Sequence, residues 1–311
     1  MEAKTRAVAG ASTGHAWILA RALVGLGAWC SLGTAASAQP PARAIDDEPS
    51  PAGQAFFLAS RTQPDGGHVP LAIVHDGQVS DAVARPAKWP AQRPRDCGAR
   101  SRWAAMGSRW HALDEWGQIA ATAVVRERHV YDVTRCAELT LSLSTAGTID
   151  GRMLFVSEDS TWRPSASPAF SPPAAVKASF QALVDATIND RRAGRAALHP
   201  QCAAIKERVR FFAGPAEERY AVGTSNIGYV VARLDGERWT PLATRIERPG
   251  MHPEAVTCFR PVAIFDMNAD GVPEVVLRQS AAGEAWGDLV LGRGRDGQWT
   301  VVAISPGSAI I

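Results

Sequence analysis

Oxygen-bearing side chains recur at alternate positions in one short loop of this 311-residue chain. They belong to positions 1, 3, 5 and 9 of the loop, which are Asp266, Asn268, Asp270 and Glu274. A calcium ion takes about six to eight oxygen ligands, and a tightly curled loop can point alternate residues inward. Gly271, at position 6, allows the sharp turn that such a loop needs. The four side chains and the backbone carbonyl of Val272 are therefore candidate Ca²⁺ ligands.

The segments on either side of this loop predict strands. Pro261–Phe265 precedes the loop, and the β-branched run Val275–Leu277 follows it. An EF-hand loop instead ends in a bidentate glutamate at position 12 and runs into a helix. Position 12 here is Leu277, so we expect a strand–loop–strand unit and not an EF-hand.

A strand, the pattern D-x-[DN]-x-D-G-x-x-[DE] and a second strand resemble the calcium loop of FG-GAP/VCBS-type repeats in extracellular β-propellers. The resemblance covers residues 261–277, and it departs from the family pattern at Pro273, where a hydrophobic residue is usual. It implies a structural Ca²⁺ held by Asp266, Asn268, Asp270, Val272 and Glu274. The alternative is an acidic turn that holds no ion, in which three neighbouring carboxylates would repel one another.

Repeated hairpin signals indicate the elements that must position this loop. Asp-Gly pairs, which favour tight hairpin turns, separate strand-like runs at residues 76–77, 150–151, 235–236 and 296–297. The C-terminal part reads as two sets of four strands. The first set is 207–213, 217–223, 228–234 and 238–246, and the second is 260–265, 273–279, 286–293 and 298–304. We predict an all-β fold of mostly antiparallel four-stranded meanders, propeller-like, with a β-sandwich as the alternative.

One amphipathic helix interrupts this pattern near residues 172–193, where apolar side chains recur at helical spacing. The domain organisation that we predict has five parts. They are a signal peptide (1–38), a disordered linker (39–53), an N-terminal β-rich half (54–163), a proline-rich segment with the helix (164–200) and a C-terminal β-rich half with the calcium loop (201–311).

The N-terminus has the order of an export signal. Lys4 and Arg6 precede the apolar stretch Ala22–Leu32, and the small residues Ala36-Ser37-Ala38 follow it. We expect cleavage after Ala38 and export to the periplasm or the extracellular space. The alternative is an uncleaved membrane anchor, but the apolar run is short for a hydrocarbon core about 30 Å thick. We therefore predict no stable membrane insertion after cleavage.

The four cysteines of the mature chain fit an oxidising compartment. An even number of cysteines in an exported protein predicts two disulfides. Three pairings are possible among Cys97, Cys136, Cys202 and Cys258. We favour Cys97 with Cys136 and Cys202 with Cys258, which places one bond in each half.

Charge and motif content bear on function. Removing residues 1–38 takes one of the 31 acidic and three of the 33 basic residues, which leaves a formal net charge of zero and argues against nucleic-acid binding. The sequence has no G-x-S-x-G, H-E-x-x-H, phosphate-loop or S-x-x-K motif, so we lean against an enzyme. We predict an exported, calcium-stabilised binding or surface-interaction protein whose ligand and oligomeric state the sequence does not indicate. The alternatives are an extracytoplasmic hydrolase or lyase acting on a glycan or other extracellular polymer, and a structural envelope protein.

Overall fold

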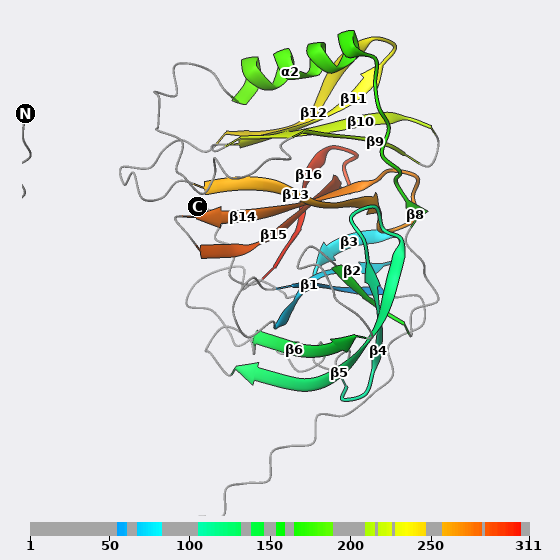
Figure 1. Cartoon of the computed structure of the whole chain (residues 1–311), viewed down its shortest axis with the longest axis vertical. Coiled ribbons are helices and arrows are strands. Elements are labelled where there is room, and N and C mark those ends of the chain that lie inside the picture. Colours follow the sequence, from blue (N-terminus) through cyan, green and yellow to red (C-terminus); the bar gives the residue numbers. More distant parts are fainter. Residues whose placement is uncertain are drawn as a thin grey trace, which may run out of the picture. The chain divides into compact units, whose positions relative to one another are not determined.

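The described part of the chain consists mostly of antiparallel strands (Figure 1). The computed structural model describes residues 55–60, 67–82, 105–131, 138–145, 154–158, 165–188, 209–214, 217–225, 228–246, 257–281 and 284–305. All of them belong to the unit Ile45–Ile311. The predicted signal peptide and linker lie outside these residues. Within them, the prediction of an all-β fold with one helix is confirmed.

Seven strands form a sheet that we call the N-terminal sheet. They are β1 (Ala55–Ser60), β2 (His68–His75), β3 (Gln78–Asp81), β4 (Arg109–Leu113), β5 (Ile119–Tyr131), β6 (Glu138–Thr145) and β7 (Leu154–Ser157). Their order is β1-β7-β4-β5-β6-β2-β3, and β1 also pairs with β2. The β2–β3 hairpin turns at Asp76-Gly77, where both residues have positive φ, as a primed turn requires.

The two predicted four-stranded meanders are both present. β9 (Val209–Ala213), β10 (Arg219–Thr224), β11 (Gly228–Asp235) and β12 (Arg238–Ile246) pair in sequence order, and we call them the outer sheet. β13 (Thr257–Asp266), β14 (Glu274–Ala281), β15 (Glu284–Arg293) and β16 (Trp299–Ile304) do the same, and the short β8 (Ser165–Ala166) adds to β13. We call this second group the central sheet.

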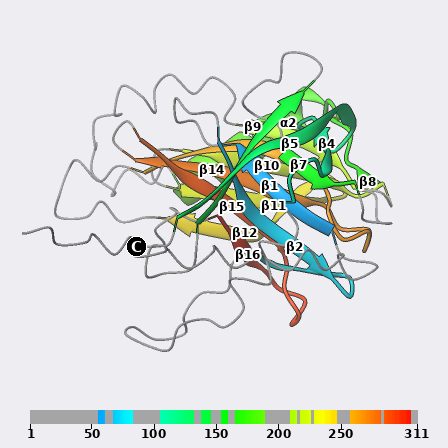
Figure 2. The same cartoon turned by 90° about the horizontal axis from the view of Figure 1, so that it is seen from below.

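The central sheet is packed on both of its faces. Val276 belongs to a core shared with the N-terminal sheet, whose members include Phe57. The adjacent Val275 belongs to a core shared with the outer sheet, whose members include Val231. Because successive residues of a strand point to opposite faces, a strand between two layers needs a continuous apolar run. The packing of β14 between two layers explains why Val275–Leu277 is an uninterrupted apolar run. Figure 2 shows the same sheets after the view is turned by 90°, so that their strands overlap.

The single described helix, α2 (Ala174–Ile188), covers the free face of the outer sheet. Phe180, Val184 and Ile188 are buried, at the helical spacing that the sequence predicts. The helix packs closely because Gly223 lies under it: a β-carbon there would sit 2.5 Å from Val184 Cγ2. Residues 189–193 of the predicted helix lie outside the described residues. In the described part of the chain, no helix has the length and apolarity needed to cross a membrane.

The turn between β4 and β5 fixes the N-terminal sheet to the strand that leads into the candidate calcium loop. Ile264 N–H donates to the Glu115 carbonyl at 2.8 Å, and Glu115 Oε2 pairs with Arg210 Nη2 at 2.9 Å. Gly117 has a φ of 82°, and a β-carbon there would lie 2.5 Å from Phe265 Cβ. Only glycine therefore allows this turn to approach β13 so closely.

The described sheets and the helix thus form successive layers. Face-to-face packing of two antiparallel sheets, as in the central and outer sheets, is the arrangement of a β-sandwich, which is the alternative that the sequence leaves open. Closure of the meanders around an axis, as in a propeller, stays a prediction.

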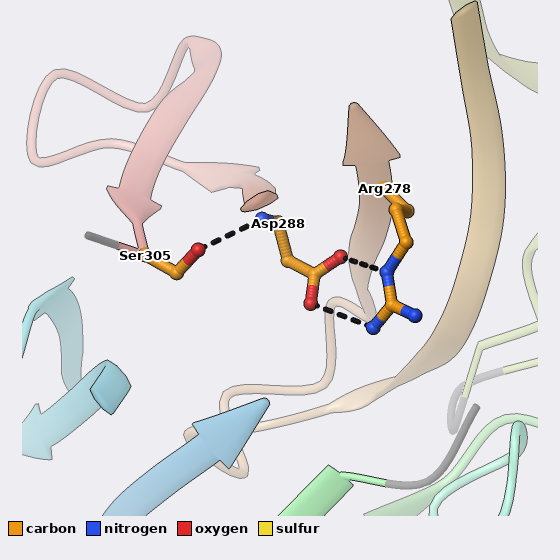
Figure 3. Close-up of polar contacts among 3 residues, drawn as sticks. All are labelled: Arg278, Asp288 and Ser305. Carbon is orange, nitrogen blue, oxygen red and sulfur yellow. Dashed lines mark hydrogen bonds and ion pairs between the residues drawn. The ribbon is translucent and has the colours of Figure 1, made fainter. Parts of the chain in front are cut away.

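A buried ion pair lies within the central sheet (Figure 3). Arg278 Nε donates to Asp288 Oδ1 at 2.8 Å, and Arg278 Nη2 donates to Asp288 Oδ2 at 3.0 Å. Asp288 N–H donates to Ser305 Oγ at 2.9 Å. Burial alone would lower the pKa of Arg278, but the charge and hydrogen bonds of Asp288 raise it above its ordinary value. The two-pronged geometry fixes the register of β14 against β15.

Asp288→Asn is expected to lower the free energy of unfolding by about 3–5 kcal/mol, because it leaves the guanidinium of Arg278 buried without its counter-ion. Replacing both residues, as Arg278→Met with Asp288→Leu, is expected to cost much less, because no buried charge remains. Urea unfolding of the two variants measures the difference. Equal losses would contradict this account of the pair.

Candidate metal centre

The loop of interest connects two neighbouring strands of the central sheet. Asp266 is the last residue of β13, and Glu274 is the first residue of β14. The chain reverses between them with positive φ at Ala269 (57°) and Gly271 (87°). Left-handed backbone is costly for alanine and free of strain for glycine. The loop leads into a strand, which confirms that it is not an EF-hand.

Side-chain oxygens within the loop accept hydrogen bonds from its own backbone. Asp270 N–H donates to Asp266 Oδ1 at 3.1 Å, and Gly271 N–H donates to Asp266 Oδ2 at 2.9 Å. Val272 N–H donates to Asp270 Oδ1 at 2.8 Å. Aspartates commonly stabilise turns in this way, by accepting from backbone two or more residues ahead. The hydrogen bonds of Asp266 and Asp270 therefore stabilise the shape of the loop without requiring an ion.

Glu274 holds the other end of the loop. Its Oε2 accepts a hydrogen bond from Met267 N–H at 2.6 Å, and Met267 itself is fully buried. Gly292 of the neighbouring strand β15 makes room for the carboxylate, because a β-carbon there would lie 2.8 Å from Glu274 Cγ. The sequence does not reveal this role of Gly292, since nothing near it signals a contact with Glu274.

Two of the carboxylates in this loop are deeply buried. Asp266 is 1 % exposed and Glu274 is 2 % exposed. Burial raises the pKa of Asp266, and it raises the pKa of Glu274 well above its ordinary value. The charge of Asp270 adds to both shifts. Among the described residues, no arginine, lysine or histidine forms an ion pair with either carboxylate.

The five predicted ligands differ in their surroundings. Asp266, Asn268 and Glu274 are buried, whereas Asp270 is exposed and Val272 is half-buried. Asn268 Oδ1 faces Asp270 N–H at 3.3 Å. In the part of the chain that is described, no three histidine, cysteine, aspartate or glutamate side chains are grouped to share an ion. Binding of Ca²⁺ by all five residues therefore requires their oxygens to move closer together than they lie here.

The donor chemistry of the loop fits a hard cation. Its candidate ligands offer carboxylate, amide and backbone-carbonyl oxygens, which are the ligands that Ca²⁺ prefers, and no thiolate or imidazole nitrogen. An ion would also supply the positive charge that the two buried carboxylates lack among the described residues. When bound, it would cross-link the loop electrostatically.

Of the four cysteines in the predicted disulfides, Cys258 alone lies within the described residues. Cys258 lies on β13 and is buried. Cys97, Cys136 and Cys202 lie outside the described residues, so the pairing of Cys202 with Cys258 and of Cys97 with Cys136 stays a prediction.

Comparison with known proteins assigns no family to the chain. No protein-family model, no curated protein and no solved structure matches it.

The ion-free chain is expected to be more stable at about pH 5 than at about pH 7.5, because Asp266 and Glu274 have raised pKa values in the folded state. Carboxyls of the unfolded chain titrate near pH 4. Protonation therefore stabilises the fold fully below about pH 4, and this contribution is lost as pH rises through the raised pKa. Melting temperatures measured in EDTA across this range check the expectation.

Glu274→Gln is the matched control for this pH dependence. It preserves an oxygen that can accept from Met267 N–H but removes the carboxyl with the larger shift, so it is expected to weaken the dependence of melting temperature on pH and leave only the contribution of Asp266. A wild-type chain whose melting temperature in EDTA is constant or rises over this range, in parallel with Glu274→Gln, would contradict the argument.

Proposed function

We propose that this chain is an exported, β-rich binding or surface-interaction protein whose fold is stabilised by one Ca²⁺ ion in the β13–β14 loop. The ligands in this proposal are the side chains of Asp266, Asn268, Asp270 and Glu274 and the carbonyl of Val272. The observation that carries the metal assignment is the burial of two carboxylates that form no ion pair within the described residues.

The electrostatic cost of this arrangement favours a cation. An ionised carboxylate taken out of water without a partner costs several kcal/mol, which is a large part of the total stability of a domain. Two such groups, with the exposed charge of Asp270 nearby, add mutual repulsion to that cost. A bound Ca²⁺ ion removes the repulsion and also allows the groups to stay ionised at neutral pH.

The position of the loop supports a structural role for the ion. It joins β13 to β14, which lie in the sheet that shares a core with both of its neighbours. Its backbone begins at the buried Met267 and ends at the buried Pro273. An ion here stabilises the pairing of two core strands, and it does not lie on a mobile sensor helix of the kind that opens in response to Ca²⁺.

Export and calcium binding support each other in this proposal. Extracellular calcium modules bind with dissociation constants of about 10⁻⁴–10⁻³ M, a range matched to calcium outside cells. The predicted signal peptide would deliver the chain to such a compartment. The partner that we propose is an extracellular ligand or surface, and without residues 1–38 the chain would carry no net positive charge that would favour nucleic acid.

The mature chain is expected to melt at a higher temperature in millimolar Ca²⁺ than in EDTA. At about 10 mM Ca²⁺ and a dissociation constant of about 10⁻⁴ M, the ion is present at about 100 times that constant and stabilises the folded state by about 2.7 kcal/mol. For a chain of this size that corresponds to an increase of roughly 5–10 °C. Differential scanning calorimetry measures the change, and identical melting temperatures in the two buffers would contradict the metal assignment.

Two substitutions at Asp270 separate ion binding from loop shape. Asp270→Asn preserves an oxygen that accepts from Val272 N–H, so it should reduce the Ca²⁺-dependent increase in melting temperature while leaving stability in EDTA nearly unchanged. Asp270→Ala removes the acceptor as well, and should cost about 1 kcal/mol more in both buffers. An Asp270→Ala variant that retains the full calcium effect would exclude this residue from the ligand set.

A further inference from the structure

The side chain at the third position of the loop also contacts the N-terminal sheet. Asn268 Nδ2 donates a hydrogen bond to the carbonyl of Gly77 at 2.9 Å, across a separation of 191 residues in sequence. Asn268 is 8 % exposed, so water competes little for this contact. Gly77 lies at the tip of the β2–β3 hairpin. The loop and the hairpin are therefore joined directly.

The same hairpin is fixed to the central sheet at a second point. Ile304 N–H of β16 donates to Asp81 Oδ1 of β3 at 2.8 Å. Between the two contacts, Val79 packs on the core that the N-terminal and central sheets share. The tip at Gly77 depends on Asn268, while the end of β3 depends on Asp81.

The chemistry of an amide explains why asparagine suits this position. Its planar group carries an acceptor, Oδ1, and a donor, Nδ2, on opposite sides. Oδ1 faces the loop, where it lies 3.3 Å from Asp270 N, and Nδ2 faces Gly77. An aspartate would offer a stronger Ca²⁺ ligand, but it has no donor and would place an oxygen against the Gly77 carbonyl.

We infer that Asn268 couples occupancy of the loop to the β2–β3 hairpin. An ion that binds Oδ1 fixes the plane of the amide and thereby aims Nδ2 at Gly77. Without the ion, Oδ1 relies on the long hydrogen bond from Asp270 N–H at 3.3 Å, so the amide plane is fixed less firmly and the bond from Nδ2 to Gly77 opens more often. Asn268 is thus a positioning residue through which Ca²⁺ holds the N-terminal sheet against the central sheet. This inference rests on the proposed function, since it requires that the loop binds Ca²⁺.

Hydrogen exchange of the hairpin tests the coupling in the mature chain. In the wild type, Ca²⁺ is expected to slow exchange of the peptide that covers residues 75–80 by about five-fold, the effect of one hydrogen bond on local opening. In Asn268→Asp, calorimetric titration should still show Ca²⁺ binding, but the slowing at residues 75–80 should be lost. Asp81→Ala is the matched control: it should speed exchange in both buffers and leave the response to Ca²⁺ in place.

The outcomes separate this inference from the proposed function. If Ca²⁺ binds the wild type but slows the hairpin equally in Asn268→Asp, or does not slow it in the wild type, the coupling is wrong and the metal site stands. If the wild type does not bind Ca²⁺ in the titration, the proposed function fails and the inference fails with it. Binding in both chains, with slowing only in the wild type, supports the coupling.

Discussion

The constraint on which this structure depends is the burial of negative charge in the central sheet. Asp266 and Glu274 bound a loop whose flanking strands pack against other layers on both faces, so neither carboxylate reaches bulk water. The same sheet contains another buried carboxylate, that of Asp288, and Arg278 on β14 neutralises it directly. The loop has no such partner among the described residues. Its charge must be met by protons or by a cation, and only a cation keeps the carboxylates ionised at neutral pH.

Because the sheets are stacked in layers, the buried carboxylates of the loop affect the packing of the neighbouring sheets as well. The central sheet shares one core with the N-terminal sheet and another with the outer sheet, which α2 covers in turn. Distortion of β13 or β14 would therefore disturb both cores. Contacts from distant parts of the chain converge near the loop as well: the β4–β5 turn bonds to Ile264, and the β2–β3 turn bonds to Asn268. The loop lies where the halves of the chain meet.

Much of this fold is readable from the sequence because the signals are local. Asp-Gly pairs predict the hairpin turns, alternating and continuous apolar runs predict the meanders, and helical spacing predicts α2. The spacing of oxygen-bearing residues identifies the loop and its entry into a strand. These features arise from neighbours in the chain, where backbone preference and side-chain periodicity act directly.

Contacts between distant segments are not readable in this way. The order of the N-terminal sheet, in which β7 lies between β1 and β4, depends on which edges meet in three dimensions. The same is true of Gly292 beside Glu274 and of Asn268 beside Gly77, since glycine and asparagine are common in turns for purely local reasons. The pairing of Arg278 with Asp288 follows from strand register, which the sequence sets only to within a few residues.

The most direct test of the account is calorimetric titration of the EDTA-treated, dialysed mature chain with Ca²⁺, alongside the Glu274→Gln variant. We predict that the wild type binds one ion per chain and that Glu274→Gln binds at least about ten-fold more weakly, because it loses a buried anionic ligand. Absence of binding by the wild type, or equal binding by the two chains, would contradict the claim that a cation balances the buried carboxylates of the central sheet.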